Sequence, residues 1–198
     1  MPTMTTYILA GGNDRSTPGY GERLAAEITK LKPNPHILSC FYAWPEAVWE
    51  DKAKTWHEWF KQNFGPRIGY DYASKDRFLS QIGTADMVYL HGGNTAMMLD
   101  ALPDASQLKA HFEGKIVVGS SAGANVLSTN FWSSTKARPL RGLGLVKLNI
   151  MVHYGKLTHE KLARTSEDWR REEAEFAKFI NGLNIVRLPE GQFIKLAN

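Results

Sequence analysis

Short apolar runs alternate with amphipathic stretches along this chain, and most of the runs stop at a glycine or proline turn. The clearest runs are 7–10, 36–42, 87–90 and 115–119. The stretches with apolar residues at helical spacing are 21–32, 46–64 and 95–102. Strands that alternate with helices in this way are typical of α/β proteins. The pattern therefore predicts an α/β fold built on a mostly parallel sheet.

The remaining segments give weaker signals of the same kind. A short strand is expected at 67–70, the start of a helix at 124–127, an extended run at 143–152 and a charged helix at 158–180. Two short strands, 185–188 and 192–196, flank Pro189-Glu190-Gly191, so we expect them to pair as a hairpin. No linker, repeat or low-complexity tract interrupts the pattern, and residues 1–198 are expected to form a single α/β domain.

Composition excludes several classes of protein. Of the 198 residues, 43% are hydrophobic and 22% are charged, which is the balance of a folded globular chain. The formal charge of +4 comes without a dense basic cluster, so nucleic acid is not an expected partner. Cys40 is the only cysteine, which suits a reducing compartment. With no apolar stretch of about 20 residues, a membrane is not an expected partner either, and we expect a cytoplasmic protein.

Gly119-Ser120-Ser121-Ala122-Gly123 has the Gly-x-Ser-x-Gly pattern of a nucleophile elbow. It lies between an apolar strand and the small-residue start of a helix, and its glycines allow a turn too tight for larger side chains. Ser121 is the bracketed serine and the expected nucleophile. The free Ala122 N–H at the helix start is placed to stabilise an oxyanion. The alternative is a plain Gly-Ser-rich turn.

A second glycine turn, His91-Gly92-Gly93-Asn94-Thr95, follows another strand. The carboxyl ends of parallel strands meet at one edge of a sheet, so the Gly93 N–H is a candidate second oxyanion donor. A simple turn that Asn94 or Thr95 caps is equally compatible with this segment. The segment has neither the lysine nor the glycine spacing of a phosphate-binding loop.

A serine nucleophile needs a base, and His153 is the best of the six histidines because it ends the extended run 148–152. No Asp or Glu lies between Ser121 and His153, so an acid that orients the imidazole must come from elsewhere. Glu190 is the best acid, although a solvated turn glutamate, or a Ser–His pair without an acid, would also fit. His159 and Glu160 follow His153 at a spacing that matches no usual zinc signature, so neither a metal nor a cofactor is expected.

These motifs together resemble the dipeptidase E and cyanophycinase family of serine peptidases. The resemblance implies a three-layer, class I glutamine amidotransferase-like fold and cleavage of small, acidic peptides after aspartate. It also implies Ser121 as nucleophile, His153 as base and the Gly93 and Ala122 amides as oxyanion hole.

For substrate binding, the resemblance suggests Asn94 and either Arg170 or Arg171, since an arginine fork suits a carboxylate. The sequence departs from the family pattern where the triad acid would lie, at 130–139, and where His91 replaces a glycine.

Two other functions remain open at this stage. The missing acid favours a non-catalytic or regulatory member of the same superfamily that binds a small molecule. An esterase or acyl-transferase could use the same elbow, because an elbow does not select the acyl group. A glutaminase is disfavoured, since its nucleophile would be a cysteine and Cys40 lies on a different strand.

Overall fold

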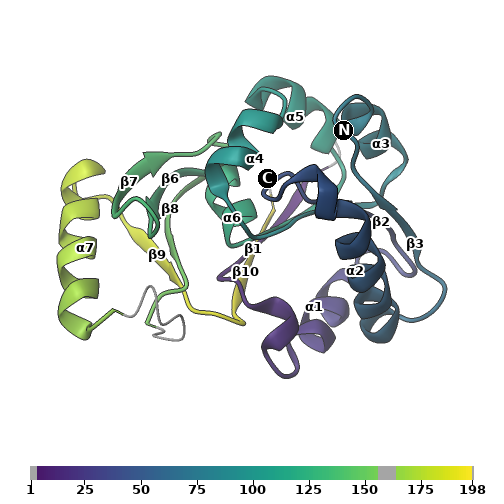
Figure 1. The fold of residues 1–198 in the computed structure, drawn as a ribbon, viewed down its shortest axis with the longest axis horizontal. Helices are drawn as coiled ribbons and strands as arrows, with labels where there is room; N and C mark the ends of the chain where they lie inside the picture. The colour runs from purple at the N-terminus through teal and green to yellow at the C-terminus, as the bar shows by residue number, and fades with distance from the viewer. Residues whose placement is uncertain (1–3, 156–163, 198) are drawn as a thin grey trace.

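The computed structural model describes residues 4–155 and 164–197, and a six-stranded sheet forms its centre (Figure 1). Its strands lie in the order β10-β1-β5-β4-β2-β3, and β10 is antiparallel to β1 while the other pairs are parallel. The bounds are β1 Thr6–Ala10, β2 His36–Cys40, β3 Gly69–Tyr72, β4 Met87–Leu90, β5 Ile116–Ser120 and β10 Phe193–Ala197.

Helices cover both faces of this sheet. On one face lie α1 (Tyr20–Thr29) and α2 (Trp49–Phe64), whose Leu24 and Phe60 pack with sheet residues of one parity. On the other face lie α3 (Phe78–Thr84), α4 (Thr95–Ala101), α5 (Ala105–Phe112) and α6 (Ala122–Leu127). Because both faces are buried, β1, β4 and β5 are apolar along almost their whole length rather than in alternation. The predicted α/β fold, with a mostly parallel sheet between helical layers, is confirmed.

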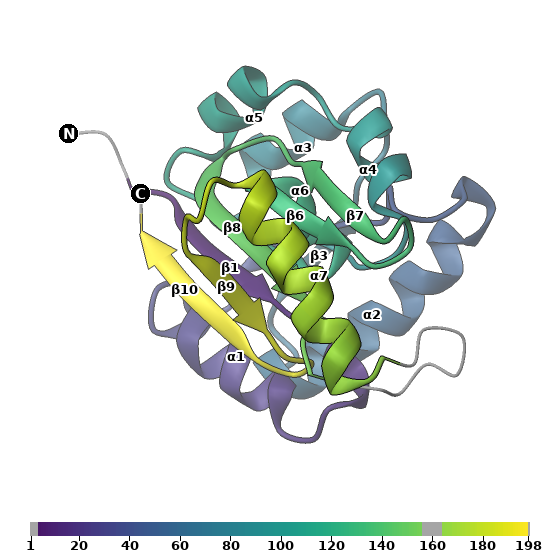
Figure 2. The same cartoon turned by 90° about the vertical axis from the view of Figure 1, so that its left-hand side faces the viewer.

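A second sheet of four strands lies beside the first, in the order β7-β6-β8-β9. Its strands are β6 Ser128–Ser133, β7 Arg138–Arg141, β8 Val146–Val152 and β9 Ile185–Leu188. Helix α7 (Ser166–Phe179) crosses this sheet, as Figure 2 shows, and Phe176 of the helix packs against Trp132 and Met151. Two short 3₁₀ turns, η1 (Asp14–Ser16) and η2 (Glu46–Val48), complete the described elements.

The prediction that 185–188 and 192–196 pair as a hairpin is wrong. Strand β9 pairs with β8 in the small sheet, whereas β10 pairs with β1 in the large one, so the turn at Pro189-Glu190-Gly191 joins two sheets. Strands β6 and β7 were not expected from the sequence. The first part of the helix expected at 158–180 falls outside the described residues, and its described part begins at Ser166. None of the described helices is long and apolar enough to cross a membrane.

Candidate active site

Ser121 lies at the sharp turn from β5 into α6, with backbone angles φ 50° and ψ −105°. A positive φ is rare for a side chain larger than glycine and marks a constrained position. The two flanking glycines make the turn possible. A Cβ on Gly123 would lie 2.1 Å from the Leu90 carbonyl oxygen, and one on Gly119 would lie 2.6 Å from the Gly123 carbonyl oxygen. The segment therefore has the geometry of a nucleophile elbow, as its sequence predicted.

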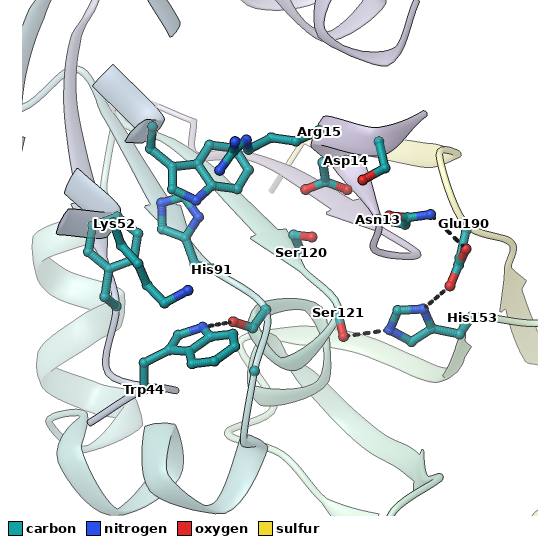
Figure 3. Close-up of a pocket in the computed structure, with 15 residues that line it drawn as sticks. Asn13, Asp14, Arg15, Trp44, Lys52, His91, Ser120, Ser121, His153 and Glu190 are labelled. Carbon is teal, nitrogen blue, oxygen red and sulfur yellow. Dashed lines mark hydrogen bonds and ion pairs between the residues drawn. The ribbon is translucent and has the colours of Figure 1, made fainter. Parts of the chain in front are cut away.

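Ser121, His153 and Glu190 form one hydrogen-bonded chain of side chains (Figure 3). The Ser121 Oγ lies 2.8 Å from His153 Nε2, and His153 Nδ1 lies 2.9 Å from Glu190 Oε1. Because a carboxylate can only accept, Nδ1 carries the ring proton and Nε2 is free to accept from the serine hydroxyl. Glu190 is held in turn by Asn13, whose Nδ2 donates to Oε2 at 3.0 Å. Its side chain is 9% exposed, so Glu190 is no solvated turn residue.

Three consecutive backbone carbonyls at the end of β1 hold these segments together. Ala10 accepts from the Ser121 N–H at 3.0 Å, and Gly11 accepts from the His153 N–H at 3.1 Å. Gly12 accepts from the Gly191 N–H at 2.9 Å, which fixes the turn that carries Glu190. Gly12 has φ 101°, and a Cβ there would lie 2.3 Å from His153 Cε1. The Gly11-Gly12 pair thus lets the backbone pass directly beneath the imidazole.

Opposite His153, the glycine turn after β4 faces the nucleophile. A Cβ on Gly92 would lie 3.2 Å from the Ser121 Cβ, so the loop lies against the serine. The Trp44 indole donates to the Gly92 carbonyl oxygen at 2.6 Å. Since the C=O and N–H of a trans peptide point in opposite directions, this bond turns the Gly93 N–H away from Trp44. Among the described residues, the Gly93 and Ala122 N–H groups donate to no protein acceptor, which leaves both able to bind an oxyanion.

A cavity of about 650 Å³ opens from Ser121, and its far wall is cationic and aromatic (Figure 3). The Lys52 Nζ lies 3.5 Å from the centre of the Trp44 ring, and the Arg15 guanidinium carbon lies 5.5 Å from the centre of Trp56. No carboxylate of the described residues forms an ion pair with either cation. Burial lowers the pKa of Lys52, and the charge of Arg15 lowers it further.

His91 lies against Trp56 in the cavity wall, with ring centroids 4.3 Å apart, and is 2% exposed. Its Nε2 lies 3.0 Å from the Ser39 Oγ, and its ring stacks on Phe41 with centroids 4.3 Å apart. Burial holds the pKa of His91 well below its ordinary value, and the charges of Lys52 and Arg15 lower it further. This histidine is therefore a neutral part of the cavity wall.

The cavity residues contributed by the segment after β1, namely Asn13, Asp14, Arg15 and Ser16, were not expected from the sequence. A signal was present, because Gly11-Gly12-Asn13-Asp14-Arg15 places polar side chains directly after a buried parallel strand. Trp56 of α2, which also lines the cavity, was hidden by its helical spacing, which equally suits a residue of the core. Lys52 lies one turn earlier on the same helix.

Three residues expected to bind substrate lie outside the lining of the cavity. The Asn94 side chain caps α4 and accepts from the N–H groups of Ala96 and Met97. Arg170 and Arg171 lie on exposed turns of α7, where Arg171 pairs with Asp168 at 2.8 Å. Neither arginine lines the cavity, because α7 packs on the small sheet and turns its apolar face toward Trp132.

The segment 130–139, where the family resemblance would put the acid, forms the end of β6, the turn that follows and the first two residues of β7. No group of three or more metal-ligating side chains occurs among the described residues.

Comparison with known proteins agrees with this fold. A peptidase from an acI-B1 Actinobacterium matches with a TM-score of 0.66 at 18% identity, covering 99% of this chain and 85% of its own. A protein assigned to peptidase E from Listeria monocytogenes EGD-e matches with a TM-score of 0.63 at 15% identity, covering 98% and 95%. The curated proteins compared with the chain give no match. Residues 45–198 match the family model for peptidase family S51, and the chain therefore belongs to this family of serine peptidases.

Proposed function

We propose that this serine peptidase cleaves short peptides after an aspartyl residue, through an acyl-enzyme on Ser121. The observation that carries the proposal is the continuous hydrogen-bonded chain from the Ser121 Oγ through His153 to Glu190. A hydroxyl, an imidazole in the accepting tautomer and a buried carboxylate are the three groups that acyl transfer by a serine requires.

In the proposed mechanism, His153 Nε2 takes the Ser121 proton while Oγ attacks the scissile carbonyl carbon. The carbonyl oxygen gains negative charge and is held by the Gly93 and Ala122 N–H groups, each worth about 3 kcal/mol of the barrier. The imidazolium then gives its proton to the leaving amine as the C–N bond breaks, which leaves an ester on Ser121. Water repeats the sequence, with His153 as base, and releases the acid.

The preference for an acidic residue is supported by the cationic wall of the cavity. Arg15 and Lys52 take the role that the sequence analysis gave to Arg170 or Arg171. Both cations line the cavity that opens from Ser121, and both lack a carboxylate partner among the described residues. A substrate carboxylate would relieve the repulsion between them.

A test compares Ser121→Ala with the matched surface variant Ser80→Ala. A fluorophosphonate probe should label the wild type and Ser80→Ala, and both proteins should cleave aspartyl p-nitroanilide. Ser121→Ala should lose the labelling and the cleavage while keeping its circular dichroism spectrum. Asparaginyl p-nitroanilide should be a much poorer substrate, and the double variant Arg15→Ala/Lys52→Ala should remove most of this difference. Labelling that persists in Ser121→Ala would dismiss the nucleophile. Equal cleavage of both anilides by the wild type would dismiss the acidic preference.

A further inference from the structure

Asp14 is a buried carboxyl in the wall of the catalytic cavity that the proposed mechanism does not use. It is the first residue of η1 and is 5% exposed. Its Oδ2 accepts from the Tyr89 hydroxyl. Its Oδ1 is buried and has no hydrogen-bond partner among the described residues. A buried carboxyl oxygen without a partner is costly, and such groups concentrate at functional sites.

The place of Asp14 relates it to the nucleophile. Figure 3 shows Ser120 between Asp14 and Ser121, and it shows Asn13 between Asp14 and Glu190. Burial raises the pKa of Asp14, whereas the hydroxyls of Ser120 and Tyr89 and the charge of His153 act in the opposite direction. A cation bound in the cavity would stabilise the ionised carboxylate in the same way.

The cavity therefore offers charges of both signs beside the nucleophile. Arg15 and Lys52 form its cationic wall, and Asp14 is the acidic group next to the strand end that carries Ser121. In an aspartyl residue at the start of a peptide, the ammonium group and the carboxylate-bearing side chain leave the same carbon, which is bonded to the scissile carbonyl. An ammonium group at that position must lie close to the nucleophile, whereas an internal residue has an uncharged amide there.

We propose that Asp14 is the residue that binds the α-ammonium group of the substrate's first residue. The proposal rests on the proposed function for its substrate, but it concerns a different group of that substrate. An ammonium group supplies the donor that Oδ1 lacks and pairs the buried charge. Substrates with a blocked or internal amino group leave Oδ1 without a donor and the buried charge without a partner.

The experiment compares two anilides that differ only in the amino group. Aspartyl p-nitroanilide has the α-ammonium, and succinyl p-nitroanilide is the same acid without it. The wild type should favour the aspartyl compound by at least tenfold in kcat/KM, the size expected for a charge-assisted hydrogen bond. The isosteric Asp14→Asn and the truncating Asp14→Ala should bring this ratio to within threefold of one. The remote Asp104→Asn, at the cap of α5, is the matched control and should keep the wild-type ratio.

A merely structural Asp14 would lower both activities together and leave the ratio unchanged, which would overturn the proposal. Calorimetry on the Ser121→Ala protein gives a second readout with aspartyl-alanine and succinyl-alanine. The first should bind at least tenfold more tightly, and adding Asp14→Asn should remove the difference. If the wild type cleaves neither anilide, the proposed function fails, and calorimetry alone decides the role of Asp14. Equal binding of the two ligands, or binding of neither, would refute the role of Asp14 in binding the ammonium group.

Discussion

Replacing Glu190 by glutamine changes which atom of His153 carries the proton. Glu190 uses both oxygens, one against His153 Nδ1 at 2.9 Å and one accepting from Asn13 Nδ2 at 3.0 Å. Glutamine has the same shape, but only its oxygen accepts. Because Asn13 presents a donor, the glutamine oxygen should turn toward Asn13 and its amide nitrogen toward His153. Nδ1 must then accept, and the ring proton moves to Nε2, the atom that has to receive the proton of Ser121.

The expected loss follows from the geometry. At 2.9 Å and an effective dielectric constant of about 20, a carboxylate attracts an imidazolium by about 6 kcal/mol. The His153 side chain is 37% exposed, so solvent screens part of this attraction. The remaining loss of transition-state stabilisation, about 4–5.5 kcal/mol, corresponds to a decrease in kcat of roughly 10³–10⁴-fold. The wrong tautomer causes a decrease of this size in Ser-His-Asp triads.

The assay measures kcat for aspartyl p-nitroanilide and, independently of the substrate, the rate at which a fluorophosphonate labels Ser121. Glu190→Gln should slow both. Adding Asn13→Asp should recover at least tenfold, because an aspartate accepts from the glutamine amide and turns the glutamine oxygen back toward His153 Nδ1. In the wild-type background, Asn13→Asp places two carboxylates together and should lower activity. A Glu190→Gln enzyme within tenfold of the wild type, or a double variant no faster than the single one, would refute the tautomer argument.

Three further predictions concern the surroundings of this triad. Gly12→Ala puts a methyl group 2.3 Å from His153 Cε1 at φ 101°, so kcat should fall at least 100-fold while circular dichroism still shows a folded protein, and wild-type activity would contradict the close approach. Trp44→Phe removes the donor to the Gly92 carbonyl. We expect kcat to fall roughly 10–100-fold with little change in KM, which is part of the contribution of one oxyanion donor. A change in KM alone would exclude the effect on the oxyanion hole. Burial raises the pKa of Asp14, so the folded state keeps this proton to higher pH than the unfolded chain does, and ionisation lowers stability as pH rises above the ordinary value of 3.8. Asp14→Asn should therefore unfold at higher urea concentration than the wild type at pH 8, with the difference shrinking toward pH 3, and a difference independent of pH would contradict the raised pKa.

The sequence predicted well the elements whose burial dictates their composition. Strand β4 has the expected bounds, Met87–Leu90, because a central strand covered on both faces must be apolar throughout. The elbow at Ser121 was equally visible, since its glycines are required by contacts of 2.1 and 2.6 Å that no other residue tolerates. In both cases one local physical constraint fixes the residue types.

The small sheet was harder to predict because its strands do not have that composition. Strand β6 begins Ser128-Thr129-Asn130, and β7 contains Pro139, which is tolerated here because β7 lies at the edge of its sheet. Local pattern also does not select a strand's partner. The segments 185–188 and 192–196 were recognised as strands, yet their partners β8 and β1 are distant in sequence. The same limit applies to Arg170 and Arg171, whose distance from the cavity depends on which sheet α7 covers.

The strand pairing that the sequence did not predict also brings an acid to His153. Strands β8 and β9 are parallel neighbours with Val152 opposite Leu188, so His153 and the turn holding Glu190 leave the same end of the small sheet. Ser121 leaves the carboxyl end of β5 in the large sheet, and the carbonyls of residues 10–12 join the two ends. An imidazole needs a carboxylate at Nδ1, and any strand end within reach can supply it. An acid near residue 135 is therefore unnecessary in this chain, because the link from β9 to β10 must cross between the sheets beside His153 and has Glu190 at that crossing.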